Sequence, residues 1–166
     1  MPVTLHLICG KIAAGKSTLA ANLAQANDAV LIAEDTWLSA LFGDQMQTVA
    51  DYVRCSAKLQ AIMGPHITAV LQAGVPVVLD FPANTRANRA WMRGISDAAG
   101  VGHVLHYLDV PDDVCRARLR ARNATGAHEF AATDAQFEMV TRHFLPPQPD
   151  EGFTVKHYAH SIMRKT

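Results

Sequence analysis

Residues 10–19 of the chain read GKIAAGKSTL and directly follow the apolar run LHLIC at residues 5–9. A short, continuous apolar run is typical of a buried strand, and residues 17–25 favour a helix. A glycine-rich turn between a strand and a helix aims main-chain N–H groups and the positive end of the helix dipole at one point, where phosphates bind. The pattern GxxxxGK[ST] therefore predicts a strand–turn–helix unit that binds a nucleoside triphosphate.

Each part of this turn has an expected role. The Lys16 ammonium should reach the β- and γ-phosphates, and the Ser17 hydroxyl should hold Mg²⁺. The main chain of the turn should surround the phosphates. The residues expected to bind the nucleotide are Gly10, Lys11, Ile12, Ala13, Ala14, Gly15, Lys16, Ser17 and Thr18.

The composition fits one soluble globular domain over residues 1–166, with 49% hydrophobic and 18% charged residues. Fifteen basic residues balance fifteen acidic ones. Extended nucleic-acid binding and membrane-surface binding both need net or clustered positive charge, so we expect neither. A small anionic substrate needs only a few local cations and stays compatible. We expect a monomer or a homodimer.

The three cysteines, Cys9, Cys55 and Cys115, show no CxxC spacing. Neither a zinc site nor a disulfide framework is indicated, and Cys9 and Cys115 are expected to be small buried hydrophobes. His103 and His106 are three residues apart on an expected strand and should point to opposite faces, so we expect no histidine metal site. The sequence has no signal-peptide pattern and no run of 18 apolar residues, which favours the cytoplasm.

Short apolar runs alternate with longer helical patterns along the chain. Strands are expected at residues 5–9, 30–33, 75–79, 103–110 and 153–158, and helices at residues 16–26, 44–63, 65–72, 88–99, 112–123 and 133–144. This alternation predicts an α/β domain with a mostly parallel sheet that helices cover on both faces.

Ligands of an open parallel sheet bind at the carboxyl ends of its strands, where acidic residues are concentrated here. Asp35 follows the second expected strand, 19 residues after Lys16. That spacing allows one helix and a return strand, so Asp35 should lie near the γ-phosphate. It is the candidate base that accepts a proton from an acceptor hydroxyl, with Glu34 in reserve. Alternatively, Asp35 caps a helix that begins at residue 36.

Asp80 ends the third expected strand after the apolar run at residues 75–79. It could hold Mg²⁺ through water or orient the acceptor, or it could simply form part of a turn or a helix cap. Asp109, before Val110 and Pro111, is more typical of a strand terminus.

Polar residues also follow Asp80. Arg86 and Arg89 are three residues apart and share a helix face if the helix has begun by Arg86. Facing the mouth of the cleft, they could grip an acceptor or a γ-phosphate bidentately; otherwise they form a solvated helix face. Asn84 could bind the acceptor or cap the helix.

Four arginines lie close together further along the chain, at positions 116, 118, 120 and 122. On a helix, Arg118 and Arg122 form one row and the other two arginines a second row. One row could face the nucleotide, because four arginines without an acid among them repel one another unless an anion binds. Residues 116–133 would then form a lid that supplies Arg118 and Arg122 to the transferring phosphoryl group. The alternative is an exposed basic helix.

Taken in order, these motifs resemble the P-loop kinases of the polynucleotide-kinase and chloramphenicol-phosphotransferase group, and the ATP-binding kinases of the AAA_33 type. The resemblance covers about residues 5–122, with further similarity at residues 137, 144–147 and 151–153. The residues that carry it are residues 10–18, Asp35, Asp80, Asn84, Arg89, Arg118 and Arg122.

The resemblance implies a three-layer P-loop NTPase sandwich with a five-stranded parallel sheet in the order 2-3-1-4-5, helices on both faces and a small lid. It further implies ATP and Mg²⁺ as cofactors, Asp35 as the proton acceptor, and a lid that includes Arg118 and Arg122. Asp35, Asp80, Asn84, Arg86 and Arg89 are then the candidate acceptor-binding residues, Lys16 joins Asp35 and the two lid arginines in catalysis, and Ser17 and Asp80 are the candidate metal ligands.

Two departures bear on the acceptor. Polynucleotide kinases usually carry an arginine three residues after the catalytic aspartate, where this chain has Leu38, and the lid lacks a further basic residue. A small, neutral or weakly polar hydroxyl compound is therefore the expected acceptor. Four apolar residues recur at helical spacing and should be core or acceptor-pocket wall: Trp37, Leu38, Leu41 and Phe42. The competing hypotheses are a nucleotide hydrolase or switch that signals to a protein, an inert nucleotide-binding module, and a toxin-type kinase of nucleotide sugars.

Overall fold

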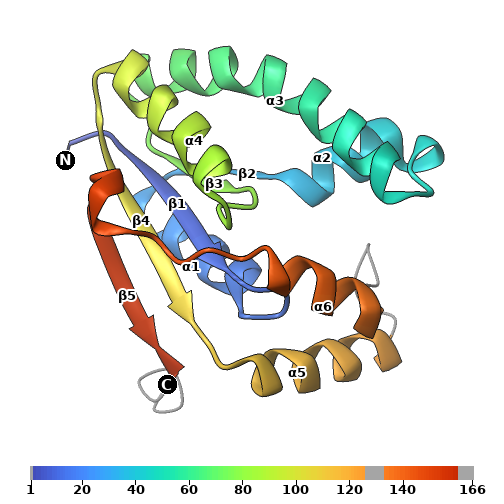
Figure 1. Ribbon diagram of the computed structural model, residues 1–166. Coiled ribbons are helices and arrows are strands. Elements are labelled where there is room, and N and C mark those ends of the chain that lie inside the picture. The colour runs from blue at the N-terminus through green and yellow to red at the C-terminus, as the bar shows by residue number, and fades with distance from the viewer. Residues whose placement is uncertain (1, 126–132, 161–166) are drawn as a thin grey trace.

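The computed structural model describes residues 2–125 and 133–160 and contains a five-stranded parallel sheet (Figure 1). Its order is β2-β3-β1-β4-β5, and every neighbouring pair is parallel. This confirms the order that the resemblance implied. The strands are β1 (Thr4–Gly10), β2 (Val30–Ala33), β3 (Val77–Asp80), β4 (Gly102–Asp109) and β5 (Val155–Ala159).

Helices cover both faces of the sheet, as predicted. They are α1 (Lys16–Asn27), α2 (Glu34–Phe42), α3 (Val49–Gln72), α4 (Arg86–Ala99), α5 (Asp112–Thr125) and α6 (Asp134–Arg142), with short 3₁₀ turns η1 (Gly43–Gln45) and η2 (Pro149–Glu151). Figure 1 shows α3 and α4 on one side of the sheet and α1 on the other.

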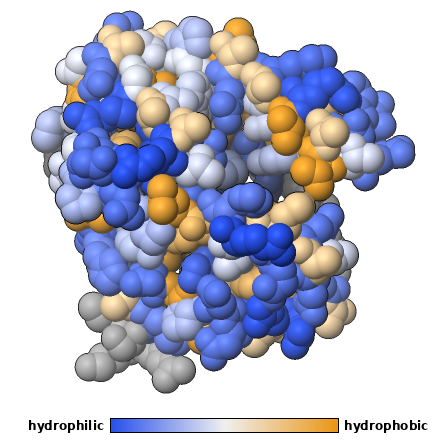
Figure 2. Space-filling model, viewed as in Figure 1, coloured by the Kyte–Doolittle hydropathy of each residue, from blue (hydrophilic) through white to orange (hydrophobic). Residues whose placement is uncertain are grey.

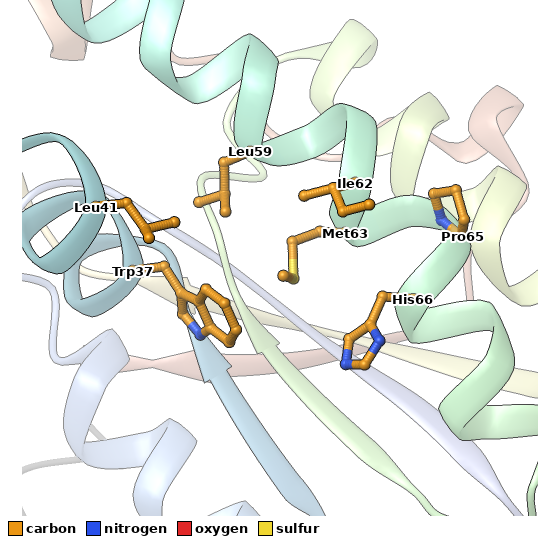
Figure 3. Close-up of a pocket in the computed structure, with 7 residues that line it drawn as sticks. All are labelled: Trp37, Leu41, Leu59, Ile62, Met63, Pro65 and His66. Carbon is orange, nitrogen blue, oxygen red and sulfur yellow. The ribbon is translucent and has the colours of Figure 1, made fainter.

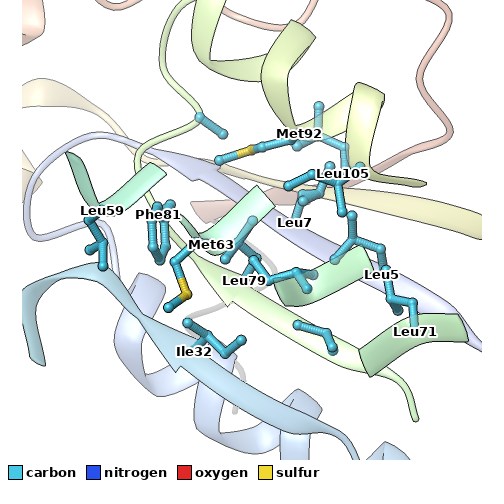
Figure 4. Close-up of a cluster of buried hydrophobic side chains, with 14 of the residues drawn as sticks. Leu5, Leu7, Ile32, Leu59, Met63, Leu71, Leu79, Phe81, Met92 and Leu105 are labelled. Carbon is cyan, nitrogen blue, oxygen red and sulfur yellow. The ribbon is translucent and has the colours of Figure 1, made fainter. Parts of the chain in front are cut away.

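Two hydrophobic clusters pack against the two faces of the central strand. Leu5, Leu7 and Cys9 of β1 belong to the larger cluster, shown in Figure 4, which packs under α3 and α4. Ile8 faces the opposite way and joins a smaller cluster with residues of α1, α5 and α6. Side chains alternate between the faces of a strand, so an unbroken apolar run is what a strand covered on both faces requires.

One long helix replaces two that the sequence predicted. We expected separate helices at residues 44–63 and 65–72, but α3 continues through Pro65. Proline inside a helix removes a hydrogen bond and costs roughly 3 kcal/mol. Met63, Ile67 and Leu71 lie four residues apart along α3 and are all buried against the sheet. Each stabilises the fold by about 1.5–3 kcal/mol, which offsets the proline.

The start of α3 was also predicted too early. The Thr48 hydroxyl accepts a hydrogen bond from the Asp51 main-chain N–H at 3.1 Å, and the Asp51 carboxylate accepts one from the Thr48 N–H at 3.1 Å. This reciprocal capping box fixes the first helical residue at Val49. Asp44 accordingly belongs to the preceding turn η1.

Within residues 2–125 and 133–160, no helix combines the length and the apolar character needed to cross a lipid bilayer.

Candidate nucleotide and phosphoryl-transfer site

The glycine-rich turn, residues 10–17 and here called the P-loop, connects β1 to α1. A Cβ atom on Gly10 would lie 3.2 Å from the Ala14 Cβ and 3.3 Å from the Leu108 Cβ, so close packing favours glycine there. Gly15 has a φ of 104°, which only glycine adopts readily, and Ala13 also has a positive φ of 64°. Such alternation of backbone conformation makes a concave, anion-binding turn.

Lys16 begins α1, and its side chain folds back over the P-loop. Its Nζ donates to the carbonyl oxygens of Gly10 at 2.9 Å and Lys11 at 3.0 Å. Burial lowers the pKa of Lys16, and the nearby carboxylates of Asp80 and Asp35 act in the opposite direction. The ammonium is therefore held by the loop carbonyl oxygens, and the charges of two acids favour its protonated form.

Ser17 and Thr18 follow Lys16 in the first turn of α1, and both are exposed. Their side chains are accessible at the positive end of this helix, where an anion or its counter-ion binds.

Asp35 and Asp80 come together at the carboxyl edge of the sheet, as the sequence predicted. Asp80 ends β3, and Asp35 lies in the first turn of α2, directly after β2. The proposed capping role of Asp35 is wrong, because α2 begins at Glu34 and its N-cap residue is Ala33. Asp35 is thus a helical residue whose carboxylate interacts electrostatically with Lys16.

Glu34, the reserve candidate for the base, is buried, and both its carboxylate oxygens have hydrogen-bond partners. Its two carboxylate oxygens accept hydrogen bonds from the Tyr52 hydroxyl at 2.5 Å and the Ser56 hydroxyl at 3.0 Å. Burial raises the pKa of Glu34, which the charges of Asp35 and Asp80 raise further. Tyr52 and Ser56 lie on α3, so Glu34 ties α2, and with it Asp35, to α3.

The arginines of α5 divide into the two predicted rows. Arg118 Nη1 donates to the carbonyl oxygen of Ala14 in the P-loop at 3.4 Å. Burial lowers the pKa of Arg122, and the negative charge of Asp35 opposes this shift in part. The buried Nε of Arg122 has no hydrogen-bond partner among the described residues. One row of α5 therefore faces the P-loop and Asp35.

The second row pairs with α6. Arg116 forms an ion pair with Glu138, and Arg120 forms one with Asp134 at 2.8 Å. The four arginines therefore do not all need a bound anion, because α6 supplies acids for two of them. These acids are distant in sequence, so helical spacing within residues 112–123 could not reveal them. Residues 126–132 of the predicted lid lie outside the described residues.

Lys11 connects the P-loop to the segment that precedes α5. Its Nζ lies 2.5 Å from the Asp112 carboxylate and donates to the carbonyl oxygen of Val110 at 3.3 Å. Asp109, at the end of β4, pairs instead with His157 at 3.0 Å. The strand-end interpretation of Asp109 therefore fits its position.

Arg89 does not lie at the mouth of a cleft. It is fully buried, and its guanidinium pairs with Glu151 at 2.8 Å. Arg86 pairs with Asp150 at 2.9 Å on the surface. The expectation that both arginines reach an acceptor needs correction, because the residues that bind them follow α6 and no local pattern links those residues to α4.

The Asn84 side chain contacts the P-loop and does not cap α4. Its side-chain oxygen accepts a hydrogen bond from the Gly10 N–H at 3.3 Å, and α4 is capped instead by the Thr85 hydroxyl, which accepts from the Asn88 N–H at 3.1 Å. Asn84 thus contacts the P-loop itself.

The surface is hollowed between the part formed by α2 and α3 and the part formed by α5 and α6, and both hydrophilic and hydrophobic side chains border the hollow (Figure 2). The P-loop lies at the carboxyl end of β1 between these two parts (Figure 1). Acids on α2 and β3 and arginines on α5 therefore approach the loop from different elements.

An apolar groove of about 470 Å³ lies elsewhere, between α2 and α3 near β2 (Figure 3). It is lined by Trp37, Leu41, Leu59, Ile62, Met63, Pro65 and His66. Trp37 is two residues from Asp35, which puts them about 200° apart around α2. Trp37 and Leu41 therefore line a surface on a different side of α2 from the candidate base, while Leu38 is buried in the core.

Comparisons with known proteins agree with this geometry. The AAA_33 family model, described as an AAA domain, matches residues 5–147. No curated protein matches the chain in sequence.

Several solved structures share the fold. A candidate kinase from Chloroflexus aurantiacus has 20% identity and a TM-score of 0.78, over 99% of this chain and 88% of that one. Chaetomium thermophilum Kti12, solved with ADP-AlF3, has 15% identity and a TM-score of 0.71, over 97% and 94%. The APS kinase of Mycobacterium tuberculosis, solved with AMPPNP and APS, has 19% identity and a TM-score of 0.63, over 99% and 93%.

At these identities the structures establish the fold, whereas the family match extends over most of the chain. The P-loop, the strand order and the family model agree. The chain belongs to the AAA_33 family of AAA domains and has the fold of the P-loop kinases.

Proposed function

We propose that the protein is an ATP-dependent kinase that moves the γ-phosphoryl group of ATP to a hydroxyl of a small, uncharged molecule. What supports the proposal is the set of groups around the P-loop: Lys16 and Arg118 contact its carbonyl oxygens, and Asp35 lies in the first turn of α2, directly after β2. The charge of Asp35 also acts on both Lys16 and Arg122, as expected of a base close to the cations that bind a γ-phosphate.

The nucleotide would bind through the main chain of the P-loop and the first turn of α1. Lys16 would exchange its contacts with Gly10 and Lys11 for phosphate oxygens, while Arg118 and Arg122 approach from α5. Three cations on one side of the site would neutralise charge on the transferring group.

The donors present suit Mg²⁺, because this ion prefers hydroxyl and carboxylate oxygens and keeps part of its water shell. The exposed Ser17 hydroxyl would hold it directly, and Asp80 would hold it through water. When bound, the ion supplies positive charge to the β- and γ-phosphates.

Transfer needs a base on the acceptor side. Asp35 would accept the proton as the acceptor oxygen forms its bond to the γ-phosphorus and the bond to the β-phosphate oxygen breaks, releasing ADP. Lys16 and the arginines would hold the phosphates in line for this displacement.

The charge around Asp35 supports an uncharged acceptor. The charges of Asp35 and Asp80 both act on Glu34 at this edge of the sheet. An anionic acceptor would be repelled by three acids, and Leu38 is a buried core residue that offers it no cation.

A screen for acceptor-stimulated ADP formation tests the proposal. The full chain would be incubated with ATP, Mg²⁺ and a panel of sugars, nucleosides, amino alcohols and antibiotics. Asp35→Asn should lower the stimulated rate by about 10²–10⁴-fold while the ATP Kd stays unchanged. Asp44→Asn makes the same chemical change in the turn η1 and should match the wild type. Phosphate release that no acceptor accelerates would instead indicate a hydrolase.

A further inference from the structure

One buried side chain binds the segment between α6 and β5 to the loop that follows β3. The Arg89 Nε and Nη2 donate to the two Glu151 carboxylate oxygens at 2.8 and 3.0 Å. Its Nη1 donates to the carbonyl oxygens of Ala83 at 2.9 Å and Leu145 at 2.8 Å, and its Nη2 also to that of Pro146 at 3.5 Å. All five N–H groups of the guanidinium are therefore engaged, which leaves none for a ligand.

Asn84 extends these contacts to the P-loop. Its main-chain carbonyl oxygen accepts a hydrogen bond from the Leu145 N–H at 2.9 Å. Its side-chain oxygen accepts one from the Gly10 N–H at 3.3 Å. Arg89 binds the carbonyl oxygen of the preceding residue, Ala83, so the main chain at Ala83 and Asn84 is fixed while the Asn84 side chain contacts Gly10.

The position of Gly10 explains why it needs this partner. The pairing of β1 with β3 ends at Leu7 and Leu79, whereas its pairing with β4 continues to Gly10 and Leu108. Beyond the end of β3, a buried N–H of β1 must find another acceptor. The Asn84 side chain provides it.

Both main-chain polar groups of Gly10 are therefore bound by side chains. Its N–H donates to Asn84, and its carbonyl oxygen accepts from the Lys16 ammonium. A shift of Gly10 would move the resting position of Lys16 and the start of the phosphate-binding turn together. Gly10 has little room for such a shift, because Ala14 and Leu108 pack close to it.

We propose that Asn84, Arg89 and Glu151 are positioning residues for the nucleotide, which hold the P-loop in its binding conformation and do not contact the acceptor. This inference rests on the proposed nucleotide site. It replaces the acceptor-binding role that the positions of Asn84 and Arg89 after the third strand suggested.

Asn84→Ala is the first test, with Asn88→Ala on α4 as the matched control. Titration with ATP and Mg²⁺ should give a Kd about tenfold higher for Asn84→Ala, because one buried hydrogen bond to the loop is lost. Hydrogen exchange of the Gly10 amide should accelerate in the same variant. Asn88→Ala should leave both measurements unchanged. A wild-type Kd in Asn84→Ala would overturn the positioning role.

A double variant, Arg89→Met with Glu151→Leu, tests the buried pair without leaving one charge unpaired. It should also weaken ATP binding, whereas Arg93→Met should not. Arg93 is a suitable control because it donates to Gly152 O at 2.8 Å, and so binds the same segment, but does not reach the loop after β3. If the double variant fails to fold, Asn84→Ala still decides.

Acceptor kinetics separate the two roles of Arg89. A positioning role predicts a raised ATP Kd and an unchanged acceptor KM in the double variant. A raised acceptor KM with an unchanged ATP Kd would overturn it. If the wild-type chain binds no adenine nucleotide, the proposed function fails and this role with it. If the wild type binds ATP and the variants bind it equally well, only the positioning role fails.

Discussion

The Nδ1 atom of His6 lies 3.0 Å from the Nε2 atom of His106, and both imidazoles are buried. The other nitrogen of His106 lies 2.7 Å from the Tyr158 hydroxyl. Three neighbouring strands are therefore joined by one chain of hydrogen bonds. If both rings are neutral, each of these hydrogen bonds has one donor and one acceptor. Protonating His106 would turn both its nitrogens into donors and disturb the chain.

The histidine pair makes stability depend on pH. Burial, with smaller effects of His6 and Lys156, lowers the pKa of His106 to about 4, and burial also lowers the pKa of His6. The unfolded chain takes up these protons near pH 6.5, so the contribution is complete above that pH and is lost as the pH falls towards 4. His106 alone should account for roughly 3 kcal/mol. Urea unfolding at pH 7.5 and 5 measures the loss. His106→Gln should reduce this pH dependence, and His66→Gln, at an exposed site, should not.

Lys16→Ala should abolish phosphoryl transfer and weaken triphosphate binding. The variant removes the cation that contacts the P-loop carbonyl oxygens and is subject to the charges of Asp35 and Asp80. We expect a loss of at least about 10²-fold in transfer, as for a single charge-stabilising donor. Lys58→Ala removes an exposed lysine from α3 and is the control. Equal ATP affinities of the two variants would contradict the role of Lys16.

Gly10→Ala should destabilise the protein and weaken ATP binding. The added methyl would contact Ala14 and Leu108 at 3.2 and 3.3 Å, which the packed loop cannot absorb without moving. Overpacking of this kind costs about 1–3 kcal/mol. Gly94→Ala adds the same methyl in α4, where nothing lies within 4 Å, and should stabilise the helix by about 0.5–1 kcal/mol. Thermal unfolding should therefore show a lower Tm for Gly10→Ala and a higher Tm for Gly94→Ala than for the wild type.

Tyr52→Phe should loosen the contact between α2 and α3. It removes one of the two hydroxyls that donate to the buried Glu34 carboxylate, at a cost of about 1.5–3 kcal/mol. Because Asp35 follows Glu34, transfer should fall together with the free energy of unfolding. Val53→Ala, at an exposed neighbouring position, should change neither. A stable Tyr52→Phe variant would mean that Ser56 alone satisfies Glu34.

Pro65→Ala should stabilise the protein. The substitution returns a main-chain N–H to the interior of α3, where proline costs roughly 3 kcal/mol, and a more flexible unfolded chain offsets about 1 kcal/mol of the gain. Thermal unfolding measures the difference. An unchanged Tm would mean that the neighbouring carbonyl already has another partner.

Local sequence patterns were enough to predict much of the fold. The strand, the turn and the helix could be predicted together because their signals are contiguous in the chain. These signals are the apolar run, the glycines at positions 10 and 15, and the lysine at position 16. The acids at positions 35 and 80 could be assigned to one edge because parallel strands bring their carboxyl ends together.

Local pattern failed where the decisive partner is distant. Pro65 indicated a helix end, yet packing of α3 on the sheet outweighs the proline. No acid near Arg116 and Arg120 in the sequence could be assigned as their partner, because their ion-pair partners lie on α6. The buried pair of His6 and His106 joins residues a hundred positions apart.

The sequence by itself therefore determined the phosphate-binding turn and the alternating architecture, because both depend on interactions between residues near in the chain. It also assigned the acids to one edge of the sheet, because parallel strands end on the same side. Only the tertiary structure decided what Asn84, Arg89 and Glu34 do. A charged or polar side chain takes its role from the groups that satisfy it when buried, and here those groups come from α3, from the P-loop and from the segment before β5.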